Sequence, residues 1–185
     1  YEKTTLFFSV QQNALRLLPD DEMVETYIET VTLLTSHDFE HYELSNFCRP
    51  GHASTHNKAY WDRKPYRGFG LHASSFDGAC RTTNQANLSQ YISQMATTTT
   101  GTCYRQSEIL TPEQARIELL MLSLRQKEGL DLQRMLYLTE DANREKILTT
   151  IKQLIQAGLI TVSKNTIRLT PRGMVLENEV ILKLI

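Results

Sequence analysis

The chain has 185 residues, of which 41% are hydrophobic, enough for one large or two small domains with a hydrophobic core. Its 20 Lys and Arg residues balance 21 Asp and Glu residues, so no overall field favours nucleic acid or an anionic membrane. No apolar run approaches the roughly 20 residues that span a bilayer, and the first residues lack the layout of a signal peptide. These features predict a cytoplasmic protein.

The three cysteines, Cys48, Cys80 and Cys103, are far apart in the sequence. Their spacing suits neither a disulfide framework nor a metal site built from neighbouring thiolates, so we expect reduced, structural cysteines. Position 1 is Tyr rather than Met, and no turn-forming residues such as Gly or Pro stand at the start of the chain. We therefore expect it to be a piece of a longer protein.

The first third of the chain is predicted to contain a helix followed by a strand. Residues 4–10 fit either a buried strand or the start of a helix. Acidic residues after Pro19 and an apolar face predict a helix over about residues 20–37, with Met23, Tyr27, Val31 and Leu34 on that face. Residues 39–44 alternate as a strand does, and residues 45–55 are predicted to form a loop.

A hairpin and a short helix are predicted next. Asp77-Gly78 favours a tight turn between strands at residues 73–76 and 79–83. A further short strand is predicted at 66–70, and residues 88–95 suit an amphipathic helix. The polar run over residues 97–102 is typical of a connector, so we place a domain boundary near residue 100.

The last part of the chain predicts a winged-helix-like module. Thr111, Pro112 and Gln114 form a strong helix start, and that helix is predicted to end near Lys127. The expected elements that follow are helices at 132–137 and 143–157, a hairpin of 159–162 with 166–169, and a helix from Thr170-Pro171. Such modules can read DNA, but residues 111–185 carry only 11 basic against 9 acidic residues, which favours a structural or docking role.

Residues 41–76 form the candidate functional segment, because they hold four of the five histidines, the Trp and a Gly-Phe-Gly turn. His56 lies in a His-Asn-x-x-Tyr-Trp motif, where a neutral imidazole can ligate a metal or haem iron and Tyr60 and Trp61 can pack on a flat macrocycle. A simple hydrogen-bonded role for His56 is the structural alternative. His52 and Cys48 are competing ligands, and for the glycine turn a strand-to-strand connection is the alternative to a ligand site.

Three ordered motifs resemble one protein family. They are Tyr-Glu-Leu-Ser-Asn-Phe-x-Arg-Pro-Gly from residue 42, His-Asn-x-x-Tyr-Trp from residue 56, and Gly-x-Gly-x-x-Ala-x-Ser from residue 68. Together they look like the HemN/HemW group of radical S-adenosylmethionine proteins, which comprises oxygen-independent coproporphyrinogen III oxidases and related haem chaperones. The likeness runs from Leu18 to Met174 and so covers most of the chain.

The resemblance implies an α/β plus mainly α fold. Residues 1–100 would be the last elements of a partial, TIM-like α/β barrel, and residues 101–185 the family's helical, winged-helix-like C-terminal domain. Family members bind S-adenosylmethionine and a [4Fe–4S] cluster held by three closely spaced cysteines, and no such run occurs here. The chain therefore looks like the C-terminal part of such a protein, without activity of its own.

The resemblance also implies roles for individual residues. The histidine of His-Asn-x-x-Tyr-Trp is implied to bind haem, which maps onto His56. The glycine turn is implied to contribute to a cofactor or substrate pocket, with Gly68, Gly70, Ala73 and Ser74 as the matching positions. Ser74 stands where many chaperone-type members have histidine, and His72 lies two places earlier.

The favoured function is haem binding and transfer as part of a HemW-like haem chaperone, with haem or porphyrin and a haem-acceptor protein as partners. The alternatives are an oxygen-independent coproporphyrinogen III oxidase and, further, a winged-helix nucleic-acid-binding module. We expect no nucleic acid as a partner, and leave peripheral membrane contact open.

Overall fold

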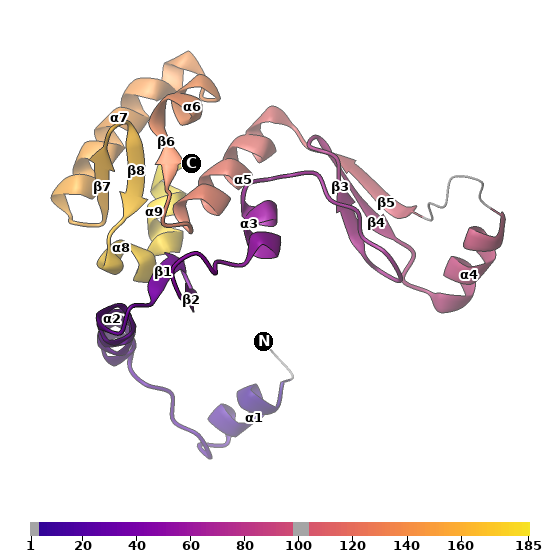
Figure 1. Ribbon diagram of the computed structural model, residues 1–185, viewed down its shortest axis with the longest axis horizontal. Coiled ribbons are helices and arrows are strands. Elements are labelled where there is room, and N and C mark those ends of the chain that lie inside the picture. Colours follow the sequence, from indigo (N-terminus) through magenta and orange to yellow (C-terminus); the bar gives the residue numbers. More distant parts are fainter. Residues whose placement is uncertain (1–3, 98–103) are drawn as a thin grey trace.

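The computed structural model describes residues 4–97 and 104–185. It has a well-packed C-terminal unit, and several elements of the preceding part of the chain extend away from that unit (Figure 1). The predicted connector falls mainly in residues 98–103, and these, with Cys103, lie outside the described residues. Within the described part, no helix combines the length and the apolar character needed to cross a membrane.

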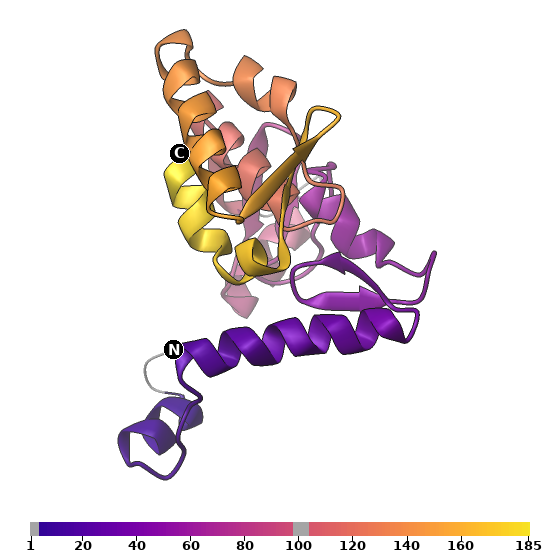
Figure 2. The same cartoon turned by 90° about the vertical axis from the view of Figure 1, so that its left-hand side faces the viewer.

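The N-terminal elements are two helices and a hairpin: α1 (Thr5–Gln11), α2 (Asp20–Ser36), β1 (Glu40–Glu43) and β2 (Asn46–Cys48). Residues 4–10 were predicted as either a strand or a helix, and the helix α1 forms there. The Thr4 side chain caps this helix by accepting a hydrogen bond from the Phe7 N–H at 3.2 Å. The helix predicted over 20–37 is present as α2. The β1–β2 hairpin lies between α2 and the C-terminal unit (Figure 2).

The middle of the chain contains α3 (Thr55–Trp61), β3 (Ser74–Phe76), β4 (Cys80–Asn84), α4 (Leu88–Thr97) and β5 (Tyr104–Ile109). The predicted hairpin is confirmed: the Asp77 carboxylate accepts hydrogen bonds from the Ala79 and Cys80 N–H groups at 2.9 and 2.7 Å. The strand predicted at 66–70 is wrong, because only Tyr66 pairs, through a single bridge to Phe76. The predicted loop at 45–55 contains β2, which the sequence pattern did not indicate.

The strand pairs of the described residues are all antiparallel, in sheets ordered β1-β2, β3-β4-β5 and β6-β8-β7. An α/β barrel is built from parallel strands joined by crossover helices. Short turns join β1 to β2 and β3 to β4 instead. The chain thus has mixed α and β content. Its described strands pair only in antiparallel sheets, so the expected barrel elements are not confirmed.

The C-terminal unit begins with α5 (Pro112–Leu124), whose Thr111–Gln114 capping box forms as predicted. The remaining elements are β6 (Leu130–Asp131), α6 (Leu132–Tyr137), α7 (Asp141–Gln156), β7 (Ile160–Ser163), β8 (Thr166–Leu169), α8 (Pro171–Val175) and α9 (Glu177–Leu184). The helix–hairpin–helix order follows the prediction. The differences are the additional strand β6, the earlier end of α5, and a final helix divided at Leu176.

The hydrophobic core of the described residues lies within this C-terminal unit. Leu120, Leu124, Ile167 and Val180 are each no more than 1% exposed and come from α5, β8 and α9. By contrast, α1, α2 and α3 contain no buried residue. The candidate segment therefore takes its position from contacts with the C-terminal unit.

Candidate functional site

The His-Asn-x-x-Tyr-Trp motif forms α3, which was not predicted from the sequence. Its start is fixed by Ser54, whose hydroxyl accepts a hydrogen bond from the Asn57 N–H at 3.3 Å. His56 and Tyr60 are four residues apart and therefore share one face of the helix. Both are exposed, and their rings meet edge to face with centroids 4.8 Å apart.

An aromatic row extends from His56 toward the β3–β4 hairpin. The Tyr60 ring meets the Tyr66 ring edge to face at 4.6 Å, and Tyr66 lies 6.1 Å from Phe76. Phe76 is 4% exposed, whereas Tyr60 is 37% exposed. The row, defined as His56, Tyr60, Tyr66 and Phe76, thus leads from the surface into the hairpin.

Trp61 does not join this row. Its ring lies 6.0 Å from that of Tyr42 in β1, and the Arg125 guanidinium lies 5.3 Å from its centroid. Because consecutive residues of a helix face different directions, Trp61 packs toward the C-terminal unit. The three haem candidates therefore separate into the exposed pair His56 and Tyr60 and a packed Trp61.

The competing ligands differ in access. Cys48 is 8% exposed in β2, so its thiol is covered, whereas His52 is exposed in the turn before α3. No group of three His, Cys, Asp or Glu side chains within residues 4–97 and 104–185 is placed to hold a metal ion. Haem iron needs only one axial side chain, so the exposed imidazole of His56 fits that group.

The glycine turn is closed by its own chain. A Cβ atom on Gly68 would lie 2.2 Å from the Ser74 carbonyl oxygen, and the Gly68 N–H donates to the Ser75 hydroxyl at 3.0 Å. The buried Asn84 amide donates to the Gly70 carbonyl at 2.9 Å, and Gly70 has a φ of +94°. Position 68 thus requires glycine because the turn lies directly against the backbone of β3.

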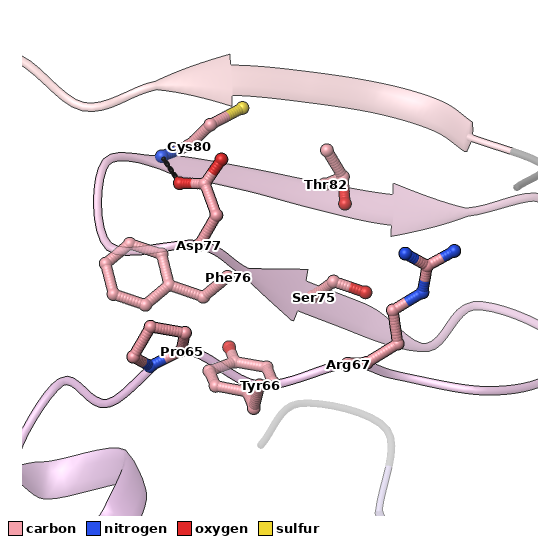
Figure 3. A pocket seen from close by; sticks show the side chains of 8 residues that line it. All are labelled: Pro65, Tyr66, Arg67, Ser75, Phe76, Asp77, Cys80 and Thr82. Carbon is pink, nitrogen blue, oxygen red and sulfur yellow. Dashed lines mark hydrogen bonds between the residues drawn. The ribbon is translucent and has the colours of Figure 1, made fainter.

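Ala73 and Ser74 are also engaged within the sheet. The Asn84 N–H donates to the Ala73 carbonyl at 2.9 Å, and the Ser74 and Thr83 hydroxyls are 3.3 Å apart. Beside them is an open pocket of about 390 Å³, lined by Ser75 and not by Ser74 (Figure 3). None of the four predicted cofactor-pocket residues lines this pocket.

Two arginines connect the hairpin to α5. The Glu118 carboxylate pairs with Arg81 Nη1 at 2.9 Å and with Arg63 Nε at 3.3 Å. This carboxylate holds the pKa of Arg81 above its usual range, so the guanidinium stays charged. The two guanidinium carbons lie 5.4 and 5.6 Å from the Phe76 ring centroid. They therefore fix the buried end of the aromatic row.

A buried carboxylate, missed in the sequence, joins the hairpin to the C-terminal unit. Glu43 has no exposed surface, and its Oε2 accepts from Arg125 Nη2 at 3.0 Å. Its Oε1 accepts from the Ser45 N–H at 2.9 Å and from the Asn46 amide. The Glu-Leu-Ser-Asn motif is thus a structural joint. The sequence did offer one sign of this role: Glu43 ends a strand and is followed closely by Ser45 and Asn46, which can donate hydrogen bonds to its carboxylate.

Comparison with known proteins matches the C-terminal unit to the HemN C-terminal domain over residues 110–176. Heme chaperone HemW of Bacillus subtilis is 32% identical over 178 residues, covering 96% of this chain and 46% of the relative. HemW of Lactococcus lactis is 28% identical over 180 residues, covering 97% and 46%. The chain spans about half the length of these curated relatives.

Two further comparisons extend this picture. The bovine mitochondrial radical S-adenosyl methionine domain-containing protein 1 is 48% identical over 68 residues, which are 36% of this chain and 15% of that protein. The solved structure of coproporphyrinogen III oxidase (HemN) from Escherichia coli superposes with a TM-score of 0.62 at 20% identity, covering 84% of this chain and 39% of that one. At this identity the likeness shows the fold.

The matching sequence segments relate the chain to the radical S-adenosylmethionine proteins, and the shared fold agrees with this. Within that class, the chain belongs to the HemN/HemW group and contains its C-terminal domain.

Proposed function

We propose that this chain contributes the haem-binding C-terminal part of a haem chaperone, which receives haem and passes it to an acceptor protein. The observation that carries the proposal is the exposed His56 on α3. Its ring nitrogens make no hydrogen bond within the described residues, and Tyr60 supports its ring edge-on. Similarity to HemW proteins over nearly the whole chain supports the same role.

The chemistry of His56 suits this role. A neutral imidazole nitrogen is a competent axial ligand, and bound haem supplies an iron that accepts it. Tyr60 contacts the His56 ring edge to face, and His56 is exposed, so its imidazole is accessible from solvent. For the whole protein, the proposal includes S-adenosylmethionine and a [4Fe–4S] cluster, but Cys48 and Cys80 lie in different sheets and receive no cluster role.

The alternatives have less support. The oxidase reading rests on the fold shared with HemN, and at 20% identity a fold carries no activity. For DNA binding, Arg144 of α7 is already engaged, because its Nη1 pairs with Asp141 at 2.7 Å and its Nε donates to the Leu136 carbonyl at 2.8 Å. DNA binding requires clustered basic side chains that neutralise phosphates, and α7 does not offer such a cluster.

The proposal is tested by titrating the chain with haem and recording the Soret band. We expect His56→Ala to weaken binding and to shift the band, because the axial nitrogen is lost. The matched control is His52→Ala, another exposed histidine four residues earlier, which should leave both unchanged. Equal affinity and an identical spectrum in His56→Ala, or a Soret band that stays that of free haem when the unaltered chain is added, would contradict the proposal.

A further inference from the structure

The pocket beside the glycine turn has two chemically different ends. Its walls come from residues 65–67 and from the β3–β4 hairpin (Figure 3). Asp77 and Cys80 lie at one end, where the Asp77 carboxylate is fixed by two backbone N–H groups. At the opposite end, Figure 3 shows the Arg67 guanidinium on the same side as Ser75 and Thr82.

Hydrogen-bond donors are available at the Arg67 end. Arg67 is exposed and has no carboxylate partner among the described residues. The Ser75 hydroxyl accepts from the Gly68 N–H, so its own proton remains free to donate. The Thr82 hydroxyl has no hydrogen bond within the described residues. A guanidinium beside two hydroxyl donors matches a carboxylate, which accepts several hydrogen bonds.

The aromatic row connects this end of the pocket to the candidate haem ligand. Tyr66 lines the pocket and contacts Tyr60, and Tyr60 contacts His56. A large flat ligand bound beside Tyr66 would thus lie near a row of ring contacts that leads to His56, with Arg67 at the pocket next to it. Haem is such a ligand, and its carboxylates lie at the edge of the ring.

We propose that Arg67, Ser75 and Thr82 form a subsite for a porphyrin carboxylate. The inference rests on the proposed haem-binding function and adds a polar anchor to the axial ligand. Asp77 limits the anchor to one end of the pocket, because its negative charge repels a second carboxylate there. Arg67 is the principal contact, since a guanidinium binds carboxylate through paired, charge-assisted hydrogen bonds.

The test compares a porphyrin with free carboxylates and its dimethyl ester. Metal-free mesoporphyrin is the probe, because its binding does not depend on an axial ligand, and binding is followed by quenching of tyrosine and tryptophan fluorescence. The unaltered chain should prefer the free acid over the ester by about five- to tenfold, as expected for a partly exposed charged contact. Arg67→Gln should abolish that preference, with unchanged binding of the ester.

Two controls separate this subsite from the proposed function. Arg172→Gln removes an exposed arginine on α8, away from the pocket, and should retain the preference for the free acid. His56→Ala should also retain it, because the probe lacks iron. Equal preference in Arg67→Gln and the unaltered chain, or no preference in the unaltered chain, would overturn the subsite. Loss of the haem spectrum only on altering His56 would still support the proposed function.

Discussion

At the scale of single residues, Gly68 shows why the glycine turn needs its sequence. The Ser74 carbonyl oxygen occupies the space that a Cβ atom would enter, at 2.2 Å, and backbone cannot rotate away as the end of a side chain can. The turn is thereby brought against β3, which also sets the position of Tyr66 and Arg67.

We expect Gly68→Ala to lower the free energy of unfolding by about 3 kcal/mol, because the β3 backbone must shift to admit the methyl group. Urea unfolding followed by circular dichroism measures this. Gly51→Ala is the control: Gly51 has a φ of +79° but open space around it, so only the conformational cost of about 1 kcal/mol applies. Equal losses in the two variants would contradict the close approach.

The three haem candidates, His56, Tyr60 and Trp61, differ in how their side chains pack. His56 and Tyr60 were predicted as haem candidates, and the helix brings their rings together. Trp61 was predicted to join them, and it packs on Tyr42 instead. Two consecutive residues of a sequence motif point in different directions when the motif forms a helix, whereas residues four apart share one face of that helix.

At the scale of elements, α2 is attached to its neighbours through Tyr27. The Tyr27 hydroxyl donates to the Leu44 carbonyl at 2.9 Å, and Met174 Sδ of α8 lies 3.6 Å from the same hydroxyl. Burial, together with the negative charges of Glu43 and Glu177, raises the pKa of Tyr27 to about 12. The phenol is thus held neutral in the folded state.

This predicts a loss of stability at alkaline pH. Between pH 10, where Tyr27 ionises in the unfolded chain, and about pH 12, the folded state retains a proton that the unfolded state releases. The free energy of unfolding should therefore fall as the pH rises through that range. Tyr27→Phe should reduce this slope, although it also costs about 1 kcal/mol at pH 8 through the lost hydrogen bond.

Urea unfolding at a series of pH values from 8 to the alkaline range provides the measurement. Tyr137→Phe serves as control, because Tyr137 is 82% exposed on α6 and should leave the slope unchanged. An identical alkaline slope in Tyr27→Phe and in the unaltered chain would show that Tyr27 does not couple folding to pH.

At the scale of the whole molecule, the Glu43–Arg125 pair joins the N-terminal hairpin to the C-terminal unit. Backbone bonds reinforce it: the Leu44 N–H donates to the Arg125 carbonyl at 2.9 Å, and the Lys127 N–H donates to the Tyr42 carbonyl at 3.1 Å. Arg125 also contacts Trp61, so α3 is positioned by the same joint. The placement of His56 therefore depends on this buried pair.

We expect Glu43→Ala to destabilise the chain by about 3 kcal/mol, because it leaves the half-buried Arg125 charge without its partner. The matched control in the same strand is Glu40→Ala. The Glu40 carboxylate lies 3.9 Å from the Lys127 ammonium, with side chains 39% and 58% exposed, and its loss should cost about 0–1 kcal/mol. Similar denaturation midpoints for the two variants would argue against a buried joint.

The sequence by itself determined the elements whose signals are local. The acidic start and apolar face of α2, the Asp77-Gly78 turn and the Thr111–Gln114 capping box each act within a few residues, so each was predicted where it occurs. The ordered motifs likewise indicated the HemN/HemW group, which the comparisons show. They selected His56 as the candidate ligand, a role that stays a prediction.

Only the tertiary structure decided the features that depend on contacts between distant residues. The glycine turn was predicted to contribute to a cofactor or substrate pocket, which stays a prediction. The structure adds that Gly68 approaches Ser74 and that the adjacent pocket is lined by Arg67 and Ser75. The joint of Glu43 with Arg125 spans 82 positions, and no local pattern records such a pairing. Strand direction likewise depends on which segments meet. The described strands form antiparallel sheets, and the barrel elements that the resemblance implied stay a prediction. Local propensity sets each element, whereas burial and charge pairing set where the elements meet.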